Sequence, residues 1–272
     1  MHYKVLFLAM SCNDPFFVES RKVVQDTWAK YLIMEEYPEY GFYSYTASET
    51  GEEYIKDNTI YLNCGDGIHD TFDKTLRCFQ FLKEQGITYD YVVRTNTSVY
   101  VNIFQVSRLV NYWSWSNIDI EGYTINIDYS SFYDDGKYPV IAGFFFIMSS
   151  NFIDKLISYS KLLILDKTKT DYGYDDFEIS KLIRIMTMNR EILNINILNP
   201  FGQVKYKTIS KNRILRDEKK TQELYNVYTN ADIVNMSAVV QYRIKNLDTK
   251  YRYQELENAY ELDEANIYRI NK

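Results

Sequence analysis

Strand-like apolar runs and amphipathic helical segments alternate along the first two-thirds of the chain, and no other feature limits the fold as strongly. Residues 5–10 form a continuous apolar run of strand length, and the segment from Phe16 to about Met34 carries its apolar and small residues on one helical face. The pattern repeats, with strands expected at 41–47, 59–62 and 89–94 and helices at 68–83 and from 102 to about 112. Such alternation predicts an α/β fold, with a mostly parallel central sheet flanked by helices on both faces.

The alternation continues to about residue 200 and then weakens. A long aromatic strand is expected at 140–149, a helix at 151–163, and a further helix, capped by Asp175 or Asp176, up to about Met188. A last strand is expected at 191–198. Residues 1–200 therefore predict one domain. Residues 201–272 predict a C-terminal extension that packs on this domain or closes over it.

Composition excludes several classes of protein. Lys and Arg number 31 against 37 Asp and Glu, a net charge of −6, so a nucleic-acid binder is not expected. No stretch approaches about 18 consecutive apolar residues, and residues 11–15 suit a turn after a buried strand better than a signal-peptide cleavage site. The three cysteines lack metal-ligand spacing, which favours reduced thiols in a cytoplasmic protein. Two histidines leave little material for a zinc site.

Tyrosine is frequent, with 27 residues among 272. Tyrosine rings suit sugars, because the flat apolar face meets C–H groups while the hydroxyl bonds at the rim. A coding bias that raises tyrosine, asparagine, isoleucine and lysine together explains the same count and is the favoured interpretation.

Polar residues follow the ends of the expected strands, where open α/β sheets bind their ligands. Three such places are residues 11–14, residues 95–98 and the 142–143 region, and a fourth is the acidic pair Asp175 and Asp176. The sequence alone leaves open whether these carboxylates do chemistry or only cap the helix that follows.

Several motifs, in order, resemble those of the inverting β-1,3-glycosyltransferases, family 31 of the glycosyltransferases, whose relatives include the Fringe enzymes. Residues 21–28 (RKVVQDTW) resemble the family's R…RxTW helix, with glutamine in place of the second arginine. Residues 91–102 (YVVRTNTSVYVN) are similar to its strand that ends in DDDVFVN, and residues 138–149 (YPVIAGFFFIMS) to its YPxxSGGGYVLS segment. Residues 66–76 loosely follow its DxYxNLxxK helix, and residues 175–177 (DDF) resemble its EDV. The resemblance runs through about residues 3–190.

This resemblance implies a GT-A-type catalytic domain over residues 1–200 that binds a nucleotide sugar, usually linked to UDP, and transfers the sugar with inversion. Such transfer needs a base for the acceptor hydroxyl and a partner for the departing diphosphate. By the resemblance, Asp176 is the base and Asp175 its neighbour. Ser11, Arg21 and Gly143 are then expected at the donor site.

The sequence departs from the family pattern at the positions that bind a divalent metal in the family. Asn96, Thr97 and Ser98 stand where the family has three aspartates, and no histidine follows His69. Amide and hydroxyl oxygens are poor substitutes for carboxylates on a small hard cation. We therefore expect no metal and no other cofactor, with manganese as the alternative.

Cations of the chain would then meet the diphosphate in the metal's place. The expected donor-binding residues are Arg94, Asn96 and Ser98 at the strand end, with Lys205 and Lys207 from the C-terminal segment. Two alternatives stay open: the lysines belong to a solvated basic loop, or Arg94 pairs with a buried carboxylate such as Asp90 or Glu121.

The sequence thus favours a metal-independent inverting glycosyltransferase that acts on a glycan, a lipid-linked saccharide or a protein-bound sugar. The chain begins at its first strand, without the family's stem and membrane anchor, so a cytoplasmic enzyme is expected, with peripheral association at a membrane surface as an option. The main alternative is an inactive sugar- or nucleotide-binding module of the same fold. A nucleotidyltransferase is disfavoured, because no glycine-rich loop and no paired metal carboxylates stand at the strand end.

Overall fold

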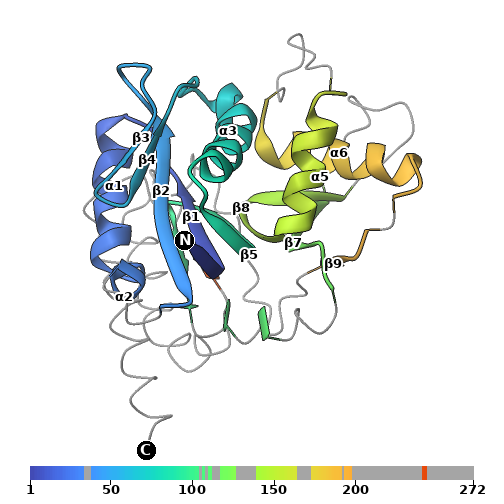
Figure 1. Ribbon diagram of the computed structural model, residues 1–272, viewed down its shortest axis with the longest axis horizontal. Helices are drawn as coiled ribbons and strands as arrows, with labels where there is room; N and C mark the ends of the chain where they lie inside the picture. Colours follow the sequence, from blue (N-terminus) through green and yellow to red (C-terminus); the bar gives the residue numbers. More distant parts are fainter. Residues whose placement is uncertain are drawn as a thin grey trace, which may run out of the picture.

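A computed structural model describes residues 1–33, 38–103, 106–107, 110–111, 117–126, 139–163, 173–191, 193–197 and 241–243. Its centre is an eight-stranded sheet with the strand order β3-β4-β2-β1-β5-β8-β7-β9 (Figure 1). The strands are β1 (His2–Met10), β2 (Tyr40–Ala47), β3 (Tyr54–Lys56), β4 (Thr59–Leu62), β5 (Thr88–Asn96), β7 (Ile120–Asn126), β8 (Pro139–Ser149) and β9 (Ile195–Ile197). The predicted α/β class is confirmed.

The direction of the strands decides which loops meet. Among the described strands, β1 runs parallel to β2 and β5, β2 runs parallel to β4, and β7 runs parallel to β9. By contrast, β8 runs antiparallel to both β5 and β7. The beginning of β8 therefore lies at the same edge of the sheet as the carboxyl ends of β1, β2, β4 and β5. This common edge is called the carboxyl edge below.

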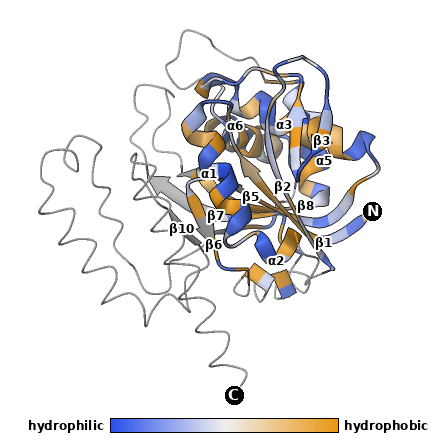
Figure 2. Cartoon of the chain, turned by 90° about the vertical axis from the view of Figure 1, so that its left-hand side faces the viewer, coloured by the Kyte–Doolittle hydropathy of each residue, from blue (hydrophilic) through white to orange (hydrophobic). Residues whose placement is uncertain are grey.

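Helices cover both faces of the sheet, as predicted. Alternate residues of β1 point to opposite faces: Phe7 packs with α1 (Pro15–Asp26) and α2 (Lys30–Ile33), whereas Leu8 packs with α3 (Thr71–Glu84), α5 (Ser150–Ser160) and α6 (Asp175–Met188). Figure 2 shows the resulting pattern, with largely hydrophobic central strands between helices that carry both hydrophobic and hydrophilic residues. None of the helices in the described ranges is long and apolar enough to cross a membrane.

The first expected helix is shorter than predicted. Asp14 caps α1 by accepting a bond from the Phe16 N–H at 2.9 Å, and the helix ends at Asp26 rather than near residue 34. The backbone leaves the helical conformation at Thr27, with φ of −111° and ψ of −114°. The following Trp28 is buried, and its indole N–H donates to the Val99 carbonyl at 3.1 Å.

Most of the other expected elements agree with the structure to within a few residues, but β3, β7 and the strand Val99–Val101 were not predicted. The helix expected from 102 to about 112 lies partly outside the described residues. The expected helix at 68–83 begins with a short 3-10 turn, Ile68–Asp70, before α3. Gly86 follows α3 with φ of 66°, a conformation that glycine adopts easily.

One short pair of strands lies outside the main sheet. β6 (Val99–Val101) runs antiparallel to β10 (Gln241–Arg243). The rest of the segment 201–272, including Lys205 and Lys207, lies outside the described residues. The role of this segment as an extension of the first domain stays a prediction.

Candidate active site

The carboxyl edge brings together six of the predicted site residues, one of which is Arg94 near the end of β5. Ser11 follows β1, Asn96 ends β5, and Gly143 lies in the first half of β8. Asp175 and Asp176 open α6, which packs on β8. Residues far apart in the sequence meet here because β8 starts where its neighbours end.

Arg94 lies inside the protein, with none of its surface exposed to solvent. Its guanidinium forms an ion pair with the Asp175 carboxylate and donates to the Gly143 carbonyl. Its Nε donates to the Tyr45 hydroxyl at 3.3 Å. The structure therefore favours the alternative in which Arg94 pairs with a buried carboxylate. The partner is Asp175, however, and not Asp90 or Glu121.

Asp176 is held at the start of β8 by the backbone. Its Oδ2 accepts from the Gly143 N–H at 3.2 Å, and its Oδ1 accepts from the Phe177 N–H at 3.0 Å. The Ser180 hydroxyl also connects α6 to β8, because it donates to the Asp176 carbonyl at 2.6 Å and accepts from the Ile141 N–H at 3.2 Å. The side chain of Asp176 keeps part of its surface exposed, whereas Asp175 is buried.

Gly143 is necessary for this arrangement. A Cβ atom at this position would come within 2.9 Å of Oδ2 of Asp176 and 3.0 Å of Oδ1 of Asp175. A larger residue would push the two carboxylates away from the strand. The one glycine that remains of the family's glycine triplet is thus the position that touches both aspartates.

Burial changes the acidity of both carboxyl groups. Desolvation raises the pKa of Asp175 to about 7, although the positive charge of Arg94 acts in the opposite direction. Desolvation also raises the pKa of Asp176, against the hydrogen bond from the Gly143 N–H, which lowers it. A carboxylate with a raised pKa is a stronger base than an ordinary aspartate, and the partial exposure of Asp176 leaves it accessible to a substrate.

The strand end at residues 96–98 does not fit the metal that the family resemblance implies. Asn96 Oδ1 and Thr97 Oγ1 are buried without a hydrogen-bond partner, and no carboxylate stands among the three residues. Neutral oxygens of this kind bind Mn²⁺ or Mg²⁺ poorly. In the part of the chain that the structure describes, no group of three or more His, Cys, Asp or Glu side chains could hold a metal.

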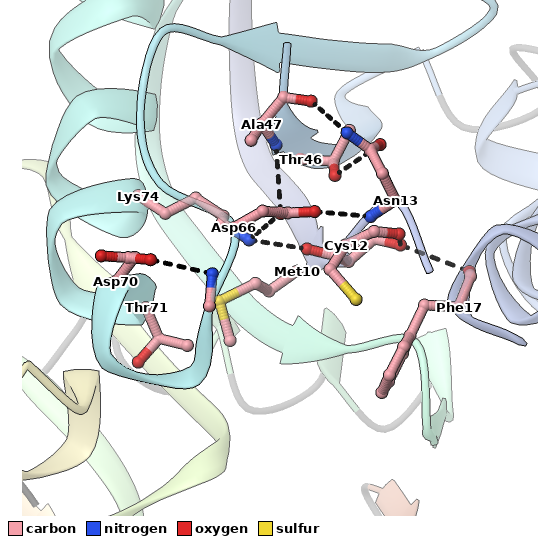
Figure 3. Close-up of polar contacts among 12 residues, drawn as sticks. Met10, Cys12, Asn13, Phe17, Thr46, Ala47, Asp66, Asp70, Thr71 and Lys74 are labelled. Atoms are coloured by element: carbon pink, nitrogen blue, oxygen red, sulfur yellow. Dashed lines mark hydrogen bonds and ion pairs between the residues drawn. The ribbon is translucent and has the colours of Figure 1, made fainter. Parts of the chain in front are cut away.

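A second polar cluster lies at the carboxyl edge, next to the ends of β1 and β2 (Figure 3). Lys74 of α3 is 1% exposed, and its ammonium donates to the Ser11 carbonyl at 3.1 Å and to the Asp66 carboxylate at 2.5 Å. The same carboxylate accepts from the Asn13 N–H at 2.6 Å. Asn13 in turn donates from its amide to the Ala47 carbonyl at 2.9 Å. One buried lysine therefore ties together the loops that follow β1, β2 and β4.

Lys74 lies within residues 66–76, which resemble the family's DxYxNLxxK helix, but the sequence predicted no role for it. A signal was present, since Lys74, Cys78 and Phe81 share one helical face and all three are buried. A lysine on such a face needs a carboxylate or carbonyl partner inside the protein.

We expect Lys74→Met to lower the free energy of unfolding by about 1.5–3 kcal/mol, the range for a hydrogen bond to a charged group. Methionine fills the same volume but leaves the Ser11 carbonyl and the Asp66 carboxylate without their donor. The measurement is a urea titration of both proteins. Lys83→Met is the matched control, because Lys83 pairs with Asp154 on the surface, where both side chains are at least 60% exposed. Equal stability of the two variants would contradict a structural role for Lys74.

Arg21 lies on α1, away from the cluster of Arg94, Gly143 and the two aspartates. It is 8% exposed on α1, its guanidinium carbon lies 5.9 Å from the ring centre of Tyr61, and its Nη1 has no hydrogen-bond partner. Tyr61 belongs to β4, which β2, β1 and β5 separate from β8 and Gly143. A donor-binding role for Arg21 stays a prediction, as it does for Ser11, Asn96 and Ser98.

Comparison with solved structures finds similar folds, whereas the comparisons by sequence find none. No protein-family model matches the chain, and no curated protein matches it. One similar solved structure is described as the crystal structure of a glycosyltransferase involved in the glycosylation of the major capsid of PBCV-1. The match covers 93% of this chain and 98% of that chain, at 11% sequence identity and a TM-score of 0.48. A likeness at this level concerns the path of the chain and says nothing about the reaction.

Proposed function

We propose that the chain is an inverting glycosyltransferase of GT-A type that moves a sugar from a nucleotide donor, UDP-linked, to a saccharide hydroxyl. One observation carries the proposal: a partly exposed aspartate, Asp176, with a raised pKa is fixed by the backbone at the carboxyl edge of the sheet. Ligands of open α/β sheets bind at this edge. The motif resemblance over residues 3–190 supports the same reaction.

In this mechanism Asp176 accepts the proton of the acceptor hydroxyl. The acceptor oxygen forms a bond to the anomeric carbon of the donor sugar while the bond from that carbon to the diphosphate oxygen breaks. UDP leaves with the electron pair of that bond, and attack from the opposite side inverts the anomeric centre. Asp176 must be ionised before the step and protonated after it, and the raised pKa of this carboxyl favours the proton transfer.

Arg94 and Asp175 have a positioning role in this proposal. The guanidinium of Arg94 donates a hydrogen bond to the Gly143 carbonyl, and the N–H of Gly143 donates one to the Asp176 carboxylate. Asp175 neutralises the buried guanidinium. Arg94 is therefore a weaker candidate for the partner of the leaving diphosphate than the sequence suggested, and that role is assigned to Lys205 and Lys207, supported by the hydroxyl of Ser98.

UDP binding is expected to survive chelation, because residues 96–98 carry no carboxylate for a metal. Isothermal titration calorimetry with UDP, in excess EDTA and again in millimolar manganese, measures this directly. The two dissociation constants should agree to within tenfold, or about 1.4 kcal/mol. A larger gain with manganese would contradict metal independence but not glycosyl transfer.

An inactive sugar- or nucleotide-binding module is the second candidate. It is favoured by the engagement of Arg94 with Asp175, which removes one cation from the proposed diphosphate site. Hydrolysis of UDP-sugars in excess EDTA separates the two. Turnover that Asp176→Asn removes supports the enzyme, whereas UDP binding without any turnover across the common UDP-sugars supports the binding module.

A further inference from the structure

Three aromatic rings cluster at the start of α6, the helix that also carries Asp176 in its first turn. In the sequence, Tyr174 precedes and Phe177 follows the aspartate pair, and His69 comes from the 3-10 turn before α3. The rings of His69 and Tyr174 stack at 5.3 Å between centres with an interplanar angle of 29°, and Tyr174 meets Phe177 edge-on at 5.9 Å. All three residues keep part of their surface exposed. They are called the aromatic platform below.

The backbone fixes the platform in place. Gly173 has φ of 76°, and its carbonyl accepts from the Phe72 N–H at 2.9 Å and from the Thr71 hydroxyl at 3.1 Å. Its N–H donates to the buried Glu178 carboxylate at 3.2 Å. A Cβ atom at position 173 would overlap the His69 carbonyl oxygen at 1.9 Å, so the turn requires glycine. The two ring-bearing segments are thereby held against each other, which lowers the entropy cost of binding a ligand on them.

The chemistry of the platform matches one kind of ligand. An aromatic ring offers an apolar face, while the tyrosine hydroxyl and the imidazole nitrogens offer hydrogen bonds at the rim. A pyranose has the complementary surface, with axial C–H groups on one face and hydroxyls around the edge. Asp176 lies between Tyr174 and Phe177 in the same first turn of α6.

We propose that the aromatic platform binds the apolar face of a pyranose ring of the acceptor and so presents one of its hydroxyls to Asp176. This inference rests on the proposed function, since it assigns the acceptor side of that same site. It names the residues that would hold the saccharide acceptor of that reaction.

The test is saturation-transfer NMR with the methyl pyranosides of glucose, galactose, mannose and N-acetylglucosamine. At least one should receive saturation from the wild-type protein, strongest on the C–H protons of one face. Tyr174→Leu, which keeps bulk but removes the ring, and His69→Ala should weaken this binding about tenfold or more, the size expected when one ring contact is lost. Tyr54→Ala is the matched control. Its ring also stacks on a tyrosine, Tyr61, at 4.6 Å, but on β3 and β4 at the other end of the sheet, and it should leave binding unchanged.

The outcome is independent of the proposed reaction. The platform is overturned if no methyl pyranoside binds the wild-type protein, or if binding survives both substitutions in variants whose circular dichroism is unaltered. Hydrolysis of UDP-sugars by the wild-type protein is scored separately. Saccharide binding that depends on the rings, without any hydrolysis, would uphold the platform and reject the transferase.

Discussion

Asp176→Asn is expected to lower the transfer rate by roughly a hundred- to ten-thousand-fold, the usual cost of losing a general base. The amide keeps the size of the carboxylate but takes no proton. Its single oxygen can accept only one of the two N–H groups that Asp176 now satisfies, those of Gly143 and Phe177. A stability loss of about 1–3 kcal/mol should therefore accompany the loss of rate, and UDP binding should persist.

The pH profile tests the same role. Because burial raises the pKa of Asp176, the acid limb of kcat/KM should lie above the ordinary aspartate value of about 3.9. Activity should fall as the pH drops through this limb, and the residual activity of Asp176→Asn should lack it. Asp154→Asn is the control, since Asp154 lies on the surface of α5 and is 60% exposed. If Asp176→Asn keeps near wild-type turnover, Asp176 is not the general base, and Asp175 becomes the next candidate for that role.

Arg94→Ala should lower the free energy of unfolding by about 3–5 kcal/mol, as is usual when one partner of a buried ion pair is removed. For a domain of this size that corresponds to a fall in Tm of roughly 6–20 °C. The variant leaves Asp175 buried without a countercharge and the Gly143 carbonyl without its donor. If Arg94 instead served the donor diphosphate, turnover would fall while Tm stayed near that of the wild type.

The deficit of Arg94→Ala should grow with pH. The folded-state pKa of Asp175, about 7, lies above its unfolded value, so ionisation of this carboxyl opposes folding as the pH rises from about 4 to about 7. Loss of Arg94 removes the charge that lowers this pKa and raises it further. Thermal unfolding should therefore show a larger gap between variant and wild type at pH 8 than at pH 5. The double variant with Asp175→Asn should narrow the gap at pH 8, and a gap that does not depend on pH would contradict this account.

Much of the fold follows from the sequence because its patterns are local. The continuous apolar run of β1, the amphipathic face of α3 and the acidic start of α6 each depend on neighbours within a few residues. The expected cap of α6 was wrong: Tyr174 is the N-cap and makes no side-chain capping bond, and Asp175 and Asp176 lie inside the first turn. The residues of β7 show no continuous apolar run of the kind that predicted β1. The helix expected from Phe16 to about Met34 was too long, because the backbone turns away from the helix at Thr27 and Trp28 is buried with its indole bonded to the Val99 carbonyl. This contact is 71 residues away in the sequence and is not visible in the helical pattern.

The site could be predicted in part for the same reason. Strand ends and the acidic pair are visible in the sequence, and so is the single glycine at position 143. The partner of Arg94 is not, because any nearby carboxylate of the chain could neutralise it. Asp175 becomes the partner only when α6 packs against β8 beside β5. Lys74 was given no role because it faces inward on a second side of α3 that the apolar pattern did not identify.

The contacts that join β5, β8, α3 and α6 also bear on how the protein acquires its chemistry. Arg94 and Gly143 are 49 residues apart, and Thr71 and Asp175, which are hydrogen-bonded, are 104 apart. Closing loops of this length lowers the entropy of the chain before any stabilising contact forms, so long-range pairings of this kind form slowly. A refolding chain should regain its helices, which are local, before Asp175 and Asp176 reach Gly143. A conformer trapped between these two stages would carry most of the native secondary structure and no working pair of carboxylates.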